Sequence, residues 1–111
     1  MDILFKERKL EKQCNRQQEL VRAHGARRAQ LIRARLDSLK AASNLLEIRN
    51  LPGRLHELTG DRKGQLSLDL DHPYRLILQP AHDPVPLNGD GGLDWSRVNA
   101  VKILGIQDTH G

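Results

Sequence analysis

The stretch Gln65–Gln79, QLSLDLDHPYRLILQ, decides the fold. Leucine recurs at every second position from Leu66 to Leu70, and apolar side chains recur in the same way from Tyr74 to Leu78. The turn-forming residues Asp71–Pro73 separate the two runs. A period of two is that of a strand with one buried face, so this stretch predicts an antiparallel hairpin with one buried and one polar face.

The segment before the hairpin has the period of a helix. Gly25 is followed by an apolar stripe with spacings of three and four, and arginines flank this stripe on both sides. We expect their stems to cover the edge of the core while their charged heads stay in water. The stripe consists of Ala29, Ile32, Leu36 and Leu39.

The remaining segments complete an α+β pattern. Asp2–Phe5 suits a short strand, Lys6–Cys14 is rich in helix formers, and Ser43–Arg49 suits a helical turn capped by Ser43 or Asn44. Val98–Ile106 is apolar enough for a buried last strand. We therefore predict one domain over residues 1–111, with N-terminal helices packed on a curved, mainly antiparallel small sheet.

Residues 80–95 form a loop longer than a hairpin needs, with three prolines and three glycines. Trp95 at its end is expected to anchor it on the core. We predict an ordered appendage, remote from the catalytic groups.

Composition excludes several classes of protein. The chain has 111 residues, 38% of them apolar, which suits one small globular domain. No run approaches the roughly 20 apolar residues that a membrane span needs, and the N-terminus has no signal-peptide pattern. A single cysteine, Cys14, excludes an internal disulfide and a multi-cysteine zinc site, and it is expected to be buried. We predict a cytoplasmic protein without metal or cofactor.

Positive charge is concentrated in the first half of the chain. Residues 1–63 contain 15 Lys and Arg against 8 Asp and Glu, whereas residues 64–111 contain 3 against 6. The stretch 22–35 holds five arginines and no acid. Such a face attracts a polyanion. We predict that RNA phosphates contact Arg22, Arg28, Arg33, Arg35, Arg62 and Lys63.

A few residues suit the cleavage of RNA without a metal. Histidine transfers protons near neutral pH, since its ordinary pKa is about 6.5, and arginine donates two parallel hydrogen bonds to phosphate. His56 and His110 are candidates for the proton transfers, and Asp108 shares a strand face with His110 if the chain is extended. Arg75 is a candidate for the phosphate, although a cross-strand ion pair with Asp69 is the simpler interpretation of this residue.

Two segments, RLHELTGDRKGQLSLDLDHPYRL at 54–76 and ILGIQDTH at 103–110, together resemble the HigB-type toxins of the RelE/ParE superfamily. That family carries a pattern like LHxLKGDRxGxWSIxVNxxWRI and ends in Asp-Tyr-His. The resemblance implies a ribosome-dependent mRNA endonuclease that a cognate helix-turn-helix antitoxin keeps silent, with operator DNA bound only through the antitoxin. It assigns function to His56, Arg75, Asp108 and His110.

This sequence departs from the family pattern at three positions. Thr109 replaces the terminal tyrosine, Thr59 replaces the lysine of LKGDR, and Leu66 replaces an aromatic residue. An aromatic ring stacks on a base, and threonine cannot. Two alternatives therefore stay open: a toxin of the same fold that poisons a protein target such as DNA gyrase without catalysis, and a non-catalytic binding module.

Overall fold

A five-stranded sheet forms the centre of the molecule. Its strand order is β1 (Asp2–Phe5), β5 (Ala100–Asp108), β4 (Tyr74–Pro80), β3 (Leu66–Asp69) and β2 (His56–Glu57). The structure, a computed structural model, describes residues 1–108. The predicted hairpin is confirmed as β3 (Leu66–Asp69) and β4 (Tyr74–Pro80), which pair antiparallel. The last strand, β5 (Ala100–Asp108), pairs antiparallel with β4 and parallel with the early strand β1 (Asp2–Phe5). The sheet is therefore mixed but mainly antiparallel, as predicted.

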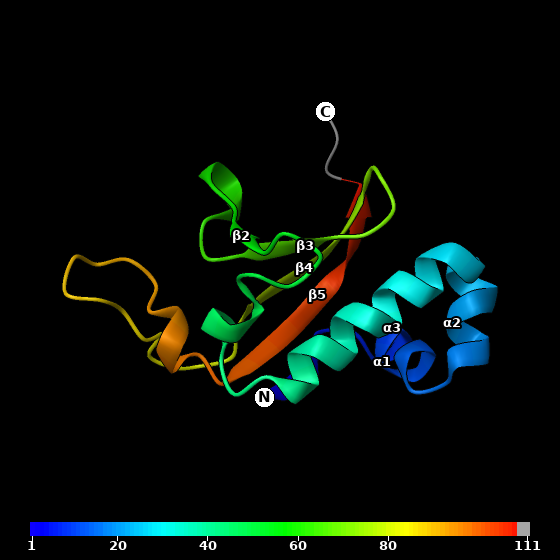
Figure 1. The fold of residues 1–111 in the computed structure, drawn as a ribbon, viewed down its shortest axis with the longest axis horizontal. Coiled ribbons are helices and arrows are strands. Elements are labelled where there is room, and N and C mark those ends of the chain that lie inside the picture. Colours follow the sequence, from blue (N-terminus) through cyan, green and yellow to red (C-terminus); the bar gives the residue numbers. More distant parts are fainter. Residues whose placement is uncertain (109–111) are drawn as a thin grey trace.

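Three helices gather on one side of this sheet (Figure 1). They are α1 (Arg8–Cys14), α2 (Gln17–His24) and α3 (Ala26–Ala41). Gly25, whose φ is 82°, separates α2 from α3. The predicted stripe on α3 is confirmed, because all four of its residues are buried. A 3₁₀ turn, Leu45–Ile48, follows where a helical turn was predicted, and the side chain of Asn44 caps it. No helix among the described residues is long and apolar enough to span a membrane.

The hydrophobic core lies between the helices and one face of the sheet. The alternating leucines of β3 and β4, such as Leu66 and Leu78, pack there with the α3 stripe. The opposite face is not simply polar, contrary to the prediction, because Ser67 and Ile77 on that face have no exposed surface. Near Ser67 the sheet is covered by the His56 side chain, whose ring nitrogens lie 3.3 and 3.5 Å from the Ser67 hydroxyl oxygen. Cys14 is buried as expected, and burial raises the pKa of its thiol to about 11.

Three of the arginines that flank the α3 stripe do not keep their heads in water, which corrects the prediction. Arg28 donates two hydrogen bonds to the Asp71 carboxylate, at 2.9 and 3.1 Å, and its guanidinium lies 3.5 Å from the centre of the Tyr74 ring. Arg33 donates to the Cys14 carbonyl oxygen at 2.8 Å. Arg35 donates to a main-chain carbonyl of β3 at 2.9 Å. These guanidinium groups therefore join the helices to one another and to the hairpin.

The segment between β4 and β5 projects from the end of the sheet away from the helices (Figure 1). Trp95 begins its 3₁₀ turn η3 (Trp95–Arg97) and packs against the core, as predicted. Its indole nitrogen also donates to the Glu57 carboxylate at 3.1 Å. Glu57 belongs to β2 (His56–Glu57), so the Trp95 end of the appendage is bonded to the strand that carries His56 and is not remote from it along the chain, although Glu57 and His56, as successive strand residues, point to opposite faces.

Candidate functional site

His56 lies on the short edge strand β2, directly after a tight turn of the main chain. Gly53 and Arg54 in this turn both have positive φ, at 111° and 49°. The turn directs the Arg54 carbonyl oxygen to His56 Nδ1, at 3.0 Å. A carbonyl oxygen only accepts hydrogen bonds, so this contact places a proton on Nδ1. In the neutral ring, Nε2 then carries the free lone pair.

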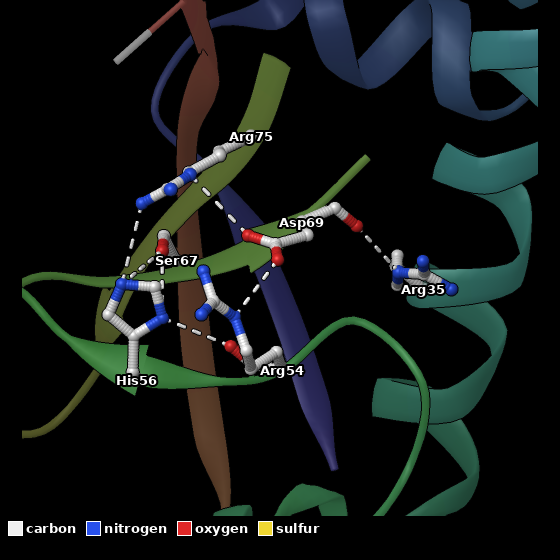
Figure 2. A network of polar contacts seen from close by, with 6 residues as sticks. All are labelled: Arg35, Arg54, His56, Ser67, Asp69 and Arg75. Atoms are coloured by element: carbon white, nitrogen blue, oxygen red, sulfur yellow. Dashed lines mark hydrogen bonds and ion pairs between the residues drawn. The ribbon is translucent and has the colours of Figure 1, made fainter. Parts of the chain in front are cut away.

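The Nε2 atom of His56 faces two polar side chains (Figure 2). Arg75 Nη1 lies 3.4 Å away, and the hydroxyl oxygen of the buried Ser67 lies 3.3 Å away. Arginine has only donors, so it is compatible with a lone pair on Nε2 and not with a second proton there. The structure therefore presents a histidine whose basic nitrogen lies beside a guanidinium group. This is an arrangement suited to taking a proton next to an anion.

Asp69 holds the arginines around this histidine (Figure 2). Its Oδ1 lies 3.4 Å from Arg75 Nε, across the strand pair, and its Oδ2 lies 3.1 Å from Arg54 Nε. The cross-strand ion pair weighed for Arg75 is therefore present. The main-chain carbonyl of Asp69 accepts the Arg35 hydrogen bond. Two guanidinium groups thus contact the carboxylate of Asp69 and a third contacts its main chain, so the cluster has excess positive charge and favours an anionic ligand.

Gly53 joins the β2 turn to this cluster. Its carbonyl oxygen accepts a hydrogen bond of 2.7 Å from the Asp69 amide. A Cβ at Gly53 would lie 2.6 Å from Arg35 Nε and 3.1 Å from a Leu68 methyl carbon. Only glycine fits this position without displacing a neighbour, so the turn, Arg35 and Asp69 are fixed together.

The other residues predicted for the site belong to other elements or lie outside the described residues. Gln107 pairs with Arg75, and Asp108 pairs with Tyr74. Because successive side chains on a strand point to opposite faces, Asp108 lies on the face opposite to Arg75. Asp108 thus does not share a sheet face with Arg75, and His110 lies outside the described residues.

Arg62 and Lys63 lie between β2 and β3, at the end of the 3₁₀ turn Gly60–Arg62. Lys63 is exposed, as is Arg22, which forms a surface ion pair with Glu19 at 3.3 Å. Residues 1–108 contain no group of three or more His, Cys, Asp or Glu side chains placed to hold a metal ion.

Two members of the cluster, Arg54 and Ser67, were not predicted from the sequence. The Pro52-Gly53 pair before Arg54 was a signal for a turn with unusual φ. Ser67 had no comparable signal, because a serine on a predicted polar strand face is expected to be solvated.

No family model matches this sequence, and no curated protein sequence matches it. Two solved structures are similar over nearly the whole chain. The YoeB-YefM complex from Staphylococcus aureus has a TM-score of 0.57 and 14% identity, covering 99% of this chain and 98% of that one. A YoeB/ParE toxin from Agrobacterium tumefaciens has a TM-score of 0.59 and 14% identity, covering 99% of this chain and 100% of that one. This chain therefore has the α+β fold of YoeB/ParE toxins, which confirms the predicted fold class.

Proposed function

We propose that this protein is the toxin of a type II toxin–antitoxin system, a HigB-type member of the RelE/ParE superfamily that cleaves mRNA on the ribosome. The observation that carries the proposal is the Nε2 atom of His56, which is left as an acceptor by the Nδ1 contact and lies 3.4 Å from Arg75. The fold of YoeB/ParE toxins supports it. Fold alone does not define an activity, so the proposal depends on the site.

The proposed reaction begins at a ribose 2′-hydroxyl. His56 Nε2 takes the proton of this hydroxyl, and the 2′-oxygen attacks the neighbouring phosphorus. Arg75 donates hydrogen bonds to the phosphate oxygens as negative charge grows on them. The bond from phosphorus to the 5′-oxygen breaks, and a general acid protonates that oxygen. The products are a 2′,3′-cyclic phosphate and a 5′-hydroxyl end.

We propose that His110, to which the resemblance to HigB-type toxins assigns function, is the general acid, with Asp108 as its neighbour. Because Asp108 lies on the opposite face from Arg75, we infer that Asp108 does not touch the scissile phosphate and at most orients the chain end. Positive charge at the phosphate comes from Arg75 in this scheme, so cleavage is expected to continue in a metal chelator.

Surface cations are proposed to make the RNA contacts outside the reacting phosphate; Arg22 and Lys63 are exposed, and Arg62 is half-buried. Arg22, Arg62 and Lys63 are proposed to bind phosphates, whereas Arg28, Arg33 and Arg35 are proposed to support the fold through their internal hydrogen bonds. RNA binding through phosphates weakens as salt rises, because counterions are released on association. An affinity for ribosomes that is the same at low and moderate salt would contradict this assignment.

The proposed partner is a cognate helix-turn-helix antitoxin, encoded beside the toxin, which binds operator DNA while the toxin contacts DNA only through it. A solved YoeB-YefM complex of the same fold supports a partner protein of this kind. We propose a cytoplasmic location, where mRNA and ribosomes are found.

The second candidate function is the poisoning of a protein target such as DNA gyrase without catalysis. Two observations favour it: one structural neighbour is described as a YoeB/ParE toxin, and Arg75 forms an ion pair with Asp69, which is also what a purely structural arginine would do. Induced expression followed by mapping of mRNA 5′ ends, with and without ribosomes, separates the two. The endonuclease proposal expects new 5′ ends that depend on His56 and require ribosomes. Growth arrest with intact mRNA and inhibited gyrase supercoiling would establish the alternative.

A further inference from the structure

Arg54 has two features that a purely structural surface arginine does not need. Its φ of 49° lies in the left-handed region, which a side chain with a Cβ rarely adopts and which Gly, Asn or Asp usually fill. Its side chain is 71% exposed, although Nε forms an ion pair with Asp69. An ion pair this exposed contributes little to folding stability. Backbone strain of this kind concentrates at functional sites.

The ion pair leaves most of the Arg54 guanidinium group unused. Only Nε contacts Asp69, so the two terminal nitrogens, which form the fork that binds phosphate, make no hydrogen bond with the described residues. Figure 2 shows the guanidinium group between the His56 ring and the Asp69 carboxylate. Arg54 therefore presents donors at the edge of the candidate site.

Asp69 holds Arg54 and Arg75 as neighbours, since its two carboxylate oxygens contact one arginine each. The carboxylate is better bonded to Arg54 than to Arg75: the distances are 3.1 and 3.4 Å, and the buried Oδ1 beside Arg75 receives no hydrogen bond from residues 1–108. Asp69 thus orients both arginines, Arg54 more closely than Arg75, and the looser Arg75 contact leaves its guanidinium room to turn toward a phosphate.

We propose that Arg54 is a second phosphate-binding residue, which contacts the phosphate adjacent to the one held by Arg75 and so sets the register of the RNA strand over His56. The ligand is single-stranded RNA, and the inference rests on the function proposed above. Asp69 acts as a positioning residue, because it orients both guanidinium groups without touching RNA.

The test uses the full-length protein and a labelled 12-nucleotide RNA with 2′-O-methyl groups, which cannot be cleaved because the attacking hydroxyl is blocked. Arg54→Gly removes the guanidinium group and suits the positive φ, so the carbonyl contact to His56 survives. The matched control is Arg49→Gln, which removes one positive charge from another exposed arginine. Arg54→Lys keeps the charge and loses the fork.

The expected result is a roughly tenfold loss of RNA affinity for Arg54→Gly. The plot of the logarithm of the binding constant against the logarithm of the salt concentration should also become shallower, by the amount expected for about one lost phosphate contact. Arg54→Lys should lose affinity by less, and Arg49→Gln by about twofold or less. The melting temperature of Arg54→Gly should stay within about 4 °C of the wild type, since a strained residue and a surface ion pair are removed together.

Two outcomes would overturn the inference. One is unchanged affinity and slope in Arg54→Gly, and the other is an equal loss in Arg49→Gln, which would indicate attraction by net charge alone. Failure of the endonuclease proposal is recognised separately: the wild type would then bind this RNA through Arg54 and still leave the unmodified RNA uncut on ribosomes.

Discussion

Replacing Gly53 by alanine tests whether the turn before His56 is as constrained as the structure indicates. The added Cβ would lie 2.6 Å from Arg35 Nε and 2.9 Å from Arg35 Cδ. The Arg35 side chain can retreat only by giving up its 2.9 Å hydrogen bond to the Asp69 carbonyl. The φ of 111° adds backbone strain for any residue with a Cβ.

These two effects give the expected magnitude. Backbone strain of this kind costs about 1–3 kcal/mol, and overpacking costs about 1–3 kcal/mol more. Gly53→Ala should therefore lower the free energy of unfolding by about 2–6 kcal/mol. A domain of this length is expected to have a stability of about 6–17 kcal/mol, so the change is large enough to measure.

Urea unfolding followed by far-ultraviolet circular dichroism measures the change. Gly89→Ala is the matched control, because Gly89 has ordinary φ and an added Cβ there meets nothing within 4 Å. It should change stability by no more than about 0.5 kcal/mol. In an Arg35→Ala background the closest steric conflict disappears and only the 3.1 Å approach to the Leu68 methyl carbon remains, so Gly53→Ala should cost little more than the backbone part. A Gly53→Ala protein as stable as Gly89→Ala would refute the constraint.

Three further changes test other contacts. Arg28 lowers the pKa of Asp71 by hydrogen bonding to its carboxylate, so the wild type should be about 1–3 kcal/mol more stable than Asp71→Asn at pH 7. This difference in stability should begin to shrink near pH 4 and vanish as the pH falls through the lowered pKa of Asp71. A difference that does not depend on pH would refute the contribution of charge. Trp95→Phe keeps a ring on the core and loses the hydrogen bond to Glu57, so it should cost about 1 kcal/mol or less and change cleavage less than threefold in a gel assay; abolished cleavage would assign the appendage to the substrate path. Deletion of His110 and Gly111 should leave the thermal unfolding curve nearly unchanged, since terminal residues seldom stabilise a fold, while cleavage is largely lost; full cleavage would remove His110 from the scheme.

The local periodicities were sufficient to predict the main elements. The period of two from Leu66 to Leu78 predicted β3 and β4, and the spacing from Ala29 to Leu39 predicted the buried face of α3. Each pattern shows which side chains of the segment face the core, and a few neighbouring residues are enough to establish such a pattern. The two-residue strand β2 has no such pattern, because it exists only through its pairing with β3.

The partners of the charged groups were harder to predict. Arg28 meets Asp71 across 43 residues of sequence, and Arg35 meets Asp69 across 34. Periodicity says which face of a helix such a residue occupies, and not which distant acceptor lies opposite. The pair Asp69 and Arg75 was predicted because both lie in one hairpin whose register follows from its turn. Arg54 was missed because its role depends on a backbone conformation that no single-residue preference indicates.

The most direct test of the proposed endonuclease is the chemistry of the RNA ends that it produces. Ribosomes carrying a defined mRNA are incubated with the wild type, His56→Ala or Arg75→Ala, and the cut ends are analysed. The proposed mechanism predicts 2′,3′-cyclic phosphate and 5′-hydroxyl ends from the wild type and at least about 100-fold slower cleavage in either variant. All three proteins should unfold cooperatively. Uncut mRNA with the folded wild type, or His56→Ala that cuts as fast as the wild type, would contradict the proposed mechanism.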